Sequence, residues 1–295
     1  PYTTLFRSDH RMVGLDCYRY GDAARYVWSV LVRVAIGVEY AGNAYEGWQT
    51  QPHGRTVQNA LERALETIAG EPVKLICAGR TDTGVHATAQ VAHFDTTAHR
   101  PLEAWVRGVN SHLPASIGVL WAVEVSDDFH ARFSATSRRY RYVLLNRRVR
   151  PGLLEGRVGW THGPLNVAAM NEAAQCLLGE HDFTSFRAAQ CQAKSPVRLI
   201  HSVSVMQSGD MVVFDFHANA FLHHMIRNLV GSLVYIGKGR CPVAWMAQLL
   251  TARQRSLAAP TFAPDGLYLC GVEYPGRWPL PCGGRIIAPP QLLVT

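Results

Sequence analysis

Apolar and polar positions along the chain repeat with two different periods, and these periods predict its secondary structure. Residues 32–40 (VRVAIGVEY) alternate at period two, as expected of a strand with one buried face. Between residues 57 and 68 the apolar positions recur every three or four residues, the spacing of one helix face, and Gly70 is placed to end this helix. The same patterns predict strands at 73–78, 88–95 and 119–125 and a helix from Pro101 to about Leu113. The first part of the chain is therefore predicted to run β-α-β-β-α-β.

The same order of elements recurs in the second part of the chain. The patterns predict strands at 139–145, 197–206, 211–217 and 267–273 and helices at 167–178 (ended by Gly179), about 221–236 and 242–252. A Ser-Gly-Asp turn between the second and third of these strands indicates a hairpin. Two split β-α-β units in tandem are typical of ferredoxin-like halves, so the predicted fold class is α+β. We assign residues 1–30 to an N-terminal appendage, 31–135 and 136–275 to the two halves, and 276–295 to a tail rich in Pro and Gly.

The positive charge of the chain indicates a polyanionic partner. The formal net charge is +7, and all but three of the 29 basic residues are arginines. Between residues 135 and 154 there are six arginines and no acid: Arg138, Arg139, Arg141, Arg147, Arg148 and Arg150. A charge run is often only a solvated face, but this one is interleaved with Tyr140 and Tyr142, which favours a nucleic-acid surface. At period two the two tyrosines share one face of their strand, and Arg139 and Arg141 point the other way.

Several classes of protein are excluded by what the chain lacks. No window approaches eighteen consecutive apolar residues, so no membrane span is expected, and residues 1–30 lack the pattern of a signal peptide. The seven cysteines are odd in number and never form Cys-x-x-Cys, which predicts reduced thiols in a cytoplasmic protein.

Metal and nucleotide cofactors are not expected either. His217, His223 and His224 are close in sequence, but the last two are adjacent and do not share a helix face with the first at ligand spacing. No glycine-rich loop follows a strand in a dinucleotide-binding or P-loop pattern.

The segment AGRTDTGVHATAQVAHF, residues 78–94, places one carboxylate, Asp82, in a turn between two apolar runs. An aspartic protease needs two carboxylates that share a proton, and the chain has no second Asp-Thr/Ser-Gly, although a symmetric dimer would supply one. A structural turn would use Asp82 to bond its own backbone. A catalytic carboxylate is favoured by its neighbours, which are Arg80 before it and His86 and His93 after it.

This segment resembles the signature of tRNA pseudouridine synthases of the TruA type, in which Gly-Arg-Thr-Asp-x-Gly-Val-His surrounds the catalytic aspartate. Further segments are similar to that family in the same order: EYAGNAYEGWQTQP, DFHARFSATSRRYRYVLLN, GEHDFTSFRA, NAFLHHMIRNLVGSL and GLYLCGVEYP. The resemblance covers roughly residues 31–275. The family usually has Ala where this chain has Thr83, a small departure.

The resemblance implies one mainly antiparallel central sheet that joins the two halves and carries a basic RNA-binding cleft. It also implies isomerisation of uridine to pseudouridine at positions 38–40 of the tRNA anticodon stem-loop. The base is flipped out of its stack, detached from C1′, turned and rejoined through C5. A homodimer is implied, with tRNA as partner and with no cofactor or metal.

The resemblance also implies roles for individual residues. Asp82 aligns with the catalytic aspartate, and Arg227 with the arginine that keeps it ionised. Tyr140 aligns with the tyrosine that stacks on the target base and takes the C5 proton. Arg80 helps to hold the base extruded, and Leu267 lines the pocket. Phosphate contacts are expected from Arg138, Arg139 and Arg141.

Two other classes of function stay open from the residues. The ferredoxin-like fold also serves non-catalytic RNA-binding modules, but such a module has no need of an acid facing RNA phosphates. A hydrolase built on Asp-Thr-Gly lacks its second carboxylate. The residues also leave open whether Asp82 attacks C1′, attacks C6 or acts as a base toward a glycal.

Overall fold

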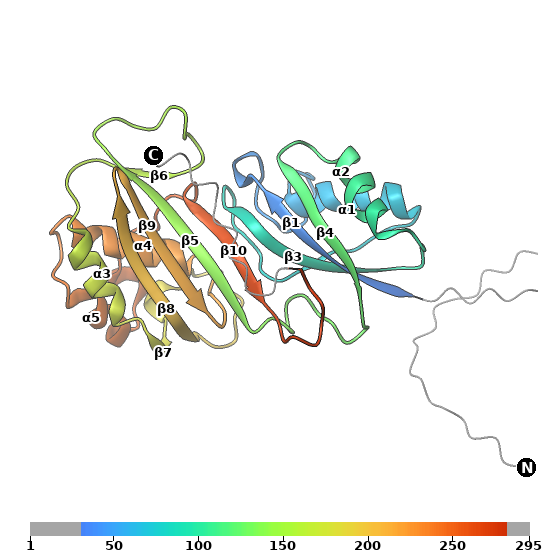
Figure 1. Ribbon diagram of the computed structural model, residues 1–295. Helices are drawn as coiled ribbons and strands as arrows, with labels where there is room; N and C mark the ends of the chain where they lie inside the picture. Colours follow the sequence, from blue (N-terminus) through green and yellow to red (C-terminus); the bar gives the residue numbers. More distant parts are fainter. Residues whose placement is uncertain (1–30, 282–295) are drawn as a thin grey trace, which may run out of the picture.

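The last strand in the chain lies in the middle of the sheet. The structure, a computed structural model, describes residues 31–281, so the predicted appendage 1–30 and residues 282–295 of the tail lie outside it. Ten strands form one sheet in the order β4-β1-β3-β10-β5-β9-β8-β7, with β2 beside β3 and β6 beside β5 (Figure 1). The strands are Val32–Tyr40 (β1), Ile76–Cys77 (β2), His86–Thr96 (β3), Ile117–Val125 (β4), Ser137–Asn146 (β5), Gly159–Thr161 (β6), Gly179–Asp182 (β7), Val197–Ser208 (β8), Met211–Ala218 (β9) and Leu267–Glu273 (β10). The helices are Val57–Ala69 (α1), Val109–His112 (α2), Val167–Gln175 (α3), Met225–Gly237 (α4) and Trp245–Ala252 (α5).

This arrangement confirms the predicted α+β fold class. The chain order is β-α-β-β-α-β in the first half, and the second half repeats it with β6, β7 and α5 added. Strand β10 joins the halves because it pairs parallel with β3 and antiparallel with β5. The other pairs are antiparallel except β5 with β6.

Helices of both halves cover the same face of the sheet. In the first half Phe94 of β3 packs edge-to-face on Trp105, which lies in the wide helical turn Ala104–Gly108 before α2. In the second half Phe214 and Phe216 of β9 are buried, and α3 packs on the neighbouring strand β8 and on α4. The sheet therefore has one helix-covered face and one open face.

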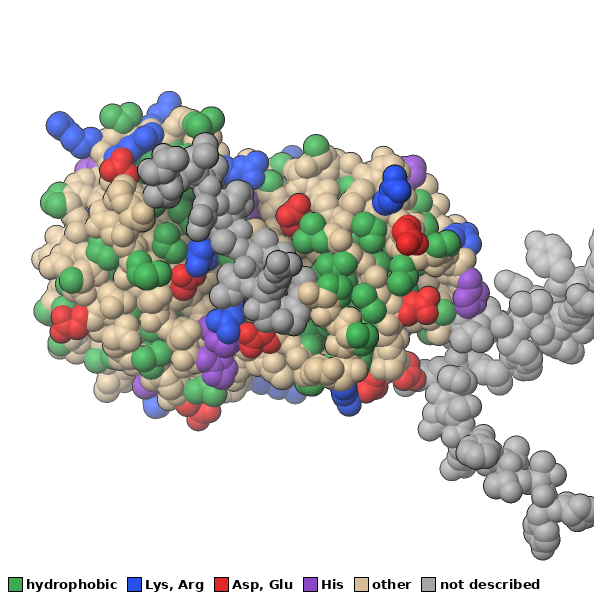
Figure 2. All heavy atoms as spheres, in the orientation of Figure 1, with side chains coloured by type: hydrophobic (Ala, Val, Ile, Leu, Met, Phe, Trp, Pro, Cys, Tyr) green, Lys and Arg blue, Asp and Glu red, His purple; other side chains and the backbone are tan. Residues whose placement is uncertain are grey.

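Charged pairs lie across the strands of the open face. Arg33 pairs with Asp95 in the first half, and Arg141 pairs with Asp215 in the second. Figure 2 shows this side of the molecule in the orientation of Figure 1. The described part of the predicted tail packs here too, because Trp278 contacts Phe129 edge-to-face.

Several predicted element boundaries were wrong, and three of these differences have a clear physical reason. The strand expected at 73–78 shrinks to β2 because side chains of α1 bind both backbone groups of Leu75: its N–H donates to Glu62 and its C=O accepts from Gln58. The helix expected to end at Gly179 ends at Gln175, where i to i−3 bonds take over, and Gly179 (φ 92°) begins β7 instead. The helix expected from 221 begins at Met225 because His224 (φ 61°) has left-handed backbone.

Within residues 31–281, no helix combines the length and the apolar composition that crossing a bilayer requires.

Candidate active site

Asp82 lies in a loop that the first half holds from two sides. The backbone N–H of Trp48 donates to Thr81 O (3.0 Å), and the Tyr40 hydroxyl lies 2.8 Å from Thr81 Oγ1. On the other side the N–H of Val85 donates to Asp82 O (3.1 Å), closing the turn through Gly84, whose φ is 80°. The backbone on either side of the carboxylate is therefore fixed.

Gly47 allows the backbone next to Trp48 to approach the Asp82 loop closely. Its φ is 85°, and a Cβ on it would lie only 2.9 Å from Thr81 O. Both the left-handed backbone and the close contact require glycine here. The EGW of the EYAGNAYEGWQTQP segment therefore supports Asp82 from 35 residues away in the chain.

Three cationic or proton-donating side chains meet the Asp82 carboxylate from the second half. Arg227 Nη1 lies 3.1 Å from Oδ2, His224 Nε2 lies 3.4 Å from Oδ2, and His223 Nε2 lies 3.2 Å from Oδ1. The left-handed backbone of His224 lets two adjacent histidines reach one carboxylate, since they precede α4 rather than belong to it. Non-glycine residues in this region mark strain that is often functional.

The two histidines are the residues that sequence reasoning missed. They were compared with His217 as metal ligands, whereas His217 lies on β9 with its Nε2 3.4 Å from Glu273. The NAFLHHMIRNLVGSL segment contained the signal, two histidines directly before a helix, but only Arg227 was assigned from it.

The surroundings of Asp82 favour its ionised form. Burial alone raises the pKa of this carboxyl, but the hydrogen bond from His223, the charges of His224 and His223 when these rings are protonated, and the charge of Arg227 outweigh burial, so its pKa is lowered. The hydrogen bond to Asp82 raises the pKa of His223, whereas burial lowers the pKa of His224. At neutral pH the His224 ring is therefore neutral, and Arg227 is the permanent positive charge beside Asp82.

Arg227 is itself held in place. Its Nε donates to Phe262 O (2.8 Å), so the guanidinium bridges this carbonyl and the carboxylate. The next residue, Asn228, is fully buried, and its Oδ1 accepts hydrogen bonds from Arg255 (2.9 Å) and Thr261 (2.7 Å). This network ties the segment before β10 to α4 and fixes the direction of the arginine.

Tyr140 and Leu267 lie on the helix-covered face, where β5 pairs with β10. Leu269 is opposite Tyr140 and Leu267 is opposite Tyr142, and all four side chains are buried. The Tyr140 ring packs edge-to-face on Phe221, with 5.1 Å between the ring centroids. Its hydroxyl faces Gly79, three residues before Asp82. Burial, followed by the charge of Asp82, raises the pKa of Tyr140, so its hydroxyl is neutral.

The expected RNA-contacting arginines fall into two groups. Arg80 is exposed beside Asp82, and among the described residues it has no ion-pair partner. Arg138 is buried and donates to four backbone carbonyls, of Ala135, Asn219, Ala78 and Arg132. Arg139 pairs with Glu273 and Arg141 with Asp215, both on the open face. The structure therefore places Arg80 at the site. Arg138, Arg139 and Arg141 instead bind carbonyl and carboxylate groups of the protein itself.

One group in residues 31–281 has the donors for a metal ion. Ligand atoms of Asp82, His223 and His224 lie within 4.8 Å of one another. The Arg227 guanidinium, however, places a positive charge 3.1 Å from Oδ2, where a cation would bind, and this disfavours a metal. The donor set is better suited to holding a carboxylate charged than to coordinating an ion.

Comparison with known proteins identifies a family whose members resemble this chain. The family model described as tRNA pseudouridine synthase matches residues 36–134 and 173–275, which contain Asp82 and Arg227, whereas Tyr140 lies between the two segments. The tRNA pseudouridine synthase A of Aromatoleum aromaticum is 65% identical over 261 residues, covering 88% of this chain and 99% of the relative. The protein of the same name from Dechloromonas aromatica is 63% identical over 250 residues, covering 85% and 95%. A solved Cbf5-Nop10-Gar1 complex aligns at 14% identity with a TM-score of 0.32, over 68% of this chain and 44% of that chain.

Proposed function

Since this chain belongs to the tRNA pseudouridine synthase family, and is therefore an isomerase that converts uridine in tRNA to pseudouridine, we propose that it acts at positions 38–40 of the anticodon stem-loop with Asp82 as its catalytic residue. One observation carries the role of Asp82. It is a largely buried carboxylate that the other half of the molecule surrounds with an arginine and two histidines.

The reaction explains why this carboxylate must stay charged. The C1′–N1 bond breaks, the base turns, and C1′ bonds to C5 while C5 loses its proton and N1 gains one, so every heavy atom of the product comes from the substrate. The base has to leave its stack before the enzyme reaches it. Bound RNA then covers Asp82 and removes the water that remains around it, which by itself would raise its pKa. Arg227 opposes this rise because it keeps its charge at any pH near neutrality.

Asp82 is proposed to act at C1′ or C6 as a nucleophile, or as a base that produces a glycal. The other roles are proposed on the strength of the family resemblance. Tyr140 stacks on the flipped base, Leu267 lines the pocket for it, and Arg80, exposed two residues before Asp82, holds the base extruded. A homodimer that acts on tRNA in the cytoplasm completes the proposal, on the strength of the family resemblance.

Release of tritium from tRNA that carries 5-tritiated uridine tests the function directly. Formation of the C1′–C5 bond expels the C5 hydrogen, whereas RNA binding or hydrolysis of the glycosidic bond leaves it in place. Binding of tRNA without tritium release would identify a non-catalytic RNA-binding module instead.

We expect the two histidines to change the pH dependence of stability in opposite directions. The raised pKa of His223 means that its contact with Asp82 stabilises the fold fully below about pH 6.5, and that this contribution is lost as pH rises through the raised pKa. The lowered pKa of His224 means that its protonation in the unfolded chain destabilises the fold below about pH 6.5.

His223→Gln should therefore lower Tm most in acid, and His224→Gln should lower it most in alkali. Thermal unfolding at about pH 5.5 and about pH 8.5 measures this, with differences of only about 1–3 °C because solvent screens both side chains. His99→Gln, which changes an exposed histidine outside the site, is the control. Identical pH profiles for both site variants would contradict the pairing with Asp82.

The salt dependence of tRNA affinity is expected to distinguish exposed, unpaired arginines of the described chain from arginines that are bound to acidic side chains. Within the described residues, Arg148 is exposed and unpaired, whereas Arg141 is bound to Asp215. Each phosphate contact contributes roughly 0.7 to 0.9 to the slope of log affinity against log salt. Arg148→Ala should reduce the slope for tRNA by about one, and Arg141→Ala should leave it unchanged.

We expect EDTA to leave turnover of tRNA intact. Loss of activity in EDTA that zinc or magnesium restores would contradict a metal-free mechanism.

A further inference from the structure

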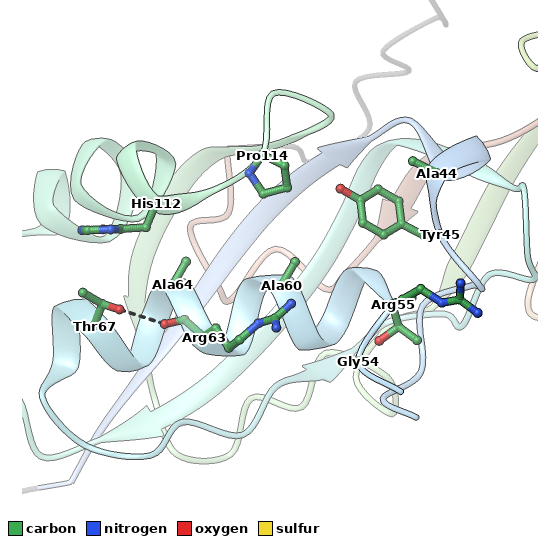
Figure 3. Close-up of a pocket in the computed structure, with 11 residues that line it drawn as sticks. Ala44, Tyr45, Gly54, Arg55, Ala60, Arg63, Ala64, Thr67, His112 and Pro114 are labelled. Atoms are coloured by element: carbon green, nitrogen blue, oxygen red, sulfur yellow. Dashed lines mark hydrogen bonds between the residues drawn. The ribbon is translucent and has the colours of Figure 1, made fainter. Parts of the chain in front are cut away.

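A pocket of about 500 Å³ opens on the helix-covered face of the first half, outside the site described above. It lies between α1 and the turn that leads from α2 into β4, and Figure 3 shows its lining. A volume in this range is typical of sites for small organic groups.

The floor of this pocket is apolar. Ala60 and Ala64 lie one turn apart on α1, and Pro114 and the ring of Tyr45 face them (Figure 3). The Tyr45 hydroxyl is 2.6 Å from Ser116 Oγ, which fixes the orientation of the ring. Small side chains beside a fixed aromatic ring leave room for a flat apolar group such as a nucleobase.

The rim of this pocket is basic. Arg63 is exposed on α1, and among the described residues its guanidinium has no ion-pair or hydrogen-bond partner. Arg55 lies on the same rim, where Glu46 neutralises part of its charge, and His112 lies at the far end. An apolar floor with arginines at its edge is complementary to a base with its phosphate.

The pocket is connected to the loop that carries Asp82 through one segment of the chain. Tyr45 is two residues before Gly47, which allows the close approach to Thr81. The backbone of Gly47 also accepts the N–H of Val57, the first residue of α1 (3.2 Å). One short segment, residues 45–48, therefore contributes to both the pocket and the support of Asp82, so one RNA molecule can contact both.

We propose that this pocket binds one nucleotide of the substrate tRNA other than the uridine that is modified. The base lies on the floor formed by Ala60, Ala64 and Pro114 beside Tyr45, and the phosphodiester lies against Arg63 and Arg55. That the RNA is tRNA rests on the proposed function; the nucleotide chemistry rests on the pocket itself.

Three variants of the full chain test this occupant by tRNA affinity and its salt dependence. Arg63→Ala should raise Kd about fivefold and reduce the salt slope by about one. Ala60→Phe, which fills the floor, should raise Kd about fivefold or more and leave the slope unchanged. Exposed Ala44→Phe is a second filling variant that does not disturb the core. Turnover at saturating tRNA should stay at the wild-type value in all three, because the pocket does not touch the reacting atoms.

Arg107→Ala is the matched control, since it removes one exposed charge from the same helical layer outside the pocket. We expect its Kd to change less than about twofold. Equal losses for Arg107→Ala and Arg63→Ala would overturn the proposal in favour of a diffuse basic field. Weaker tRNA binding by Arg63→Ala but not by either filling variant would refute binding of a base on the apolar floor. Unchanged tRNA affinity in all three variants would refute binding of tRNA in this pocket. Affinity is measured without turnover, so failure of the tritium assay would refute the proposed function and leave this test readable.

Discussion

Asp82→Asn is expected to bind tRNA with near-wild-type affinity while its tritium release falls below about a thousandth of the wild-type rate. The amide has nearly the same shape, and its oxygen still accepts a hydrogen bond from Arg227. It is, however, neither a nucleophile nor a base at this position. Binding should survive because Arg80 and the exposed arginines away from the loop are unchanged.

Asp95→Asn is a suitable control for this experiment. Asp95 is also a carboxylate paired with an arginine in the first half, Arg33, but it lies on the open face of the sheet. Its variant should turn over normally. Tritium release by Asp82→Asn above about a thousandth of wild type would remove Asp82 as the essential group and restore the interpretation as a structural turn.

Tyr140→Phe should bind tRNA normally and turn over about a hundredfold more slowly. The ring remains, and with it the proposed stacking on the base, a contact typically worth about 1–3 kcal/mol. Only the hydroxyl is lost, and no residue of the described chain forms a hydrogen bond with it. Because this hydroxyl is neutral, the proton transfer that the family resemblance implies requires it to pass its own proton on as it takes the C5 proton, and Asp82 is the candidate acceptor.

Tyr142→Phe provides the opposite result and so serves as the control. The Tyr142 hydroxyl donates to Ala263 O (2.8 Å), and its side chain is fully buried. Its removal loses this one hydrogen bond, and because Ala263 is exposed, water replaces the donor at the carbonyl, so the cost is about 1 kcal/mol or a Tm loss of about 2–4 °C. Turnover should change little. Wild-type turnover by Tyr140→Phe together with failure of Tyr140→Ala would make Tyr140 a stacking residue alone.

Strong local periodicity explains why much of the fold could be predicted from the sequence. The pattern at 32–40 coincides with β1, and the pattern at 267–273 coincides with β10. The predicted end of α1 is also confirmed, since Gly70 adopts the left-handed conformation. The missed strand β7 has the sequence Gly-Glu-His-Asp, which carries no apolar alternation and pairs only because β8 is beside it.

Contacts between distant segments could not be predicted in this way. Asp82 and Arg227 are 145 residues apart, and only the family resemblance suggested that they meet. The contact of His223 and His224 with the same carboxylate depends on one left-handed residue, which no periodicity encodes. Likewise, nothing local to Arg139 or Arg141 indicates that neighbouring strands supply their acidic partners.

The central position of β10 has a consequence for how this protein is made. Chains emerge from the ribosome with the N-terminal part first, at about 5–20 residues per second. Until residues 267–273 emerge, the edges of β3 and β5 that receive β10 are covered only in part, by the short strands β2 and β6, and the rest of these edges pairs readily with other chains. One late strand then closes both edges at once and links the nascent halves through the sheet. The newly made polypeptide therefore passes through an interval of several seconds in which premature termination or slow decoding leaves two unjoined sheets exposed to aggregation.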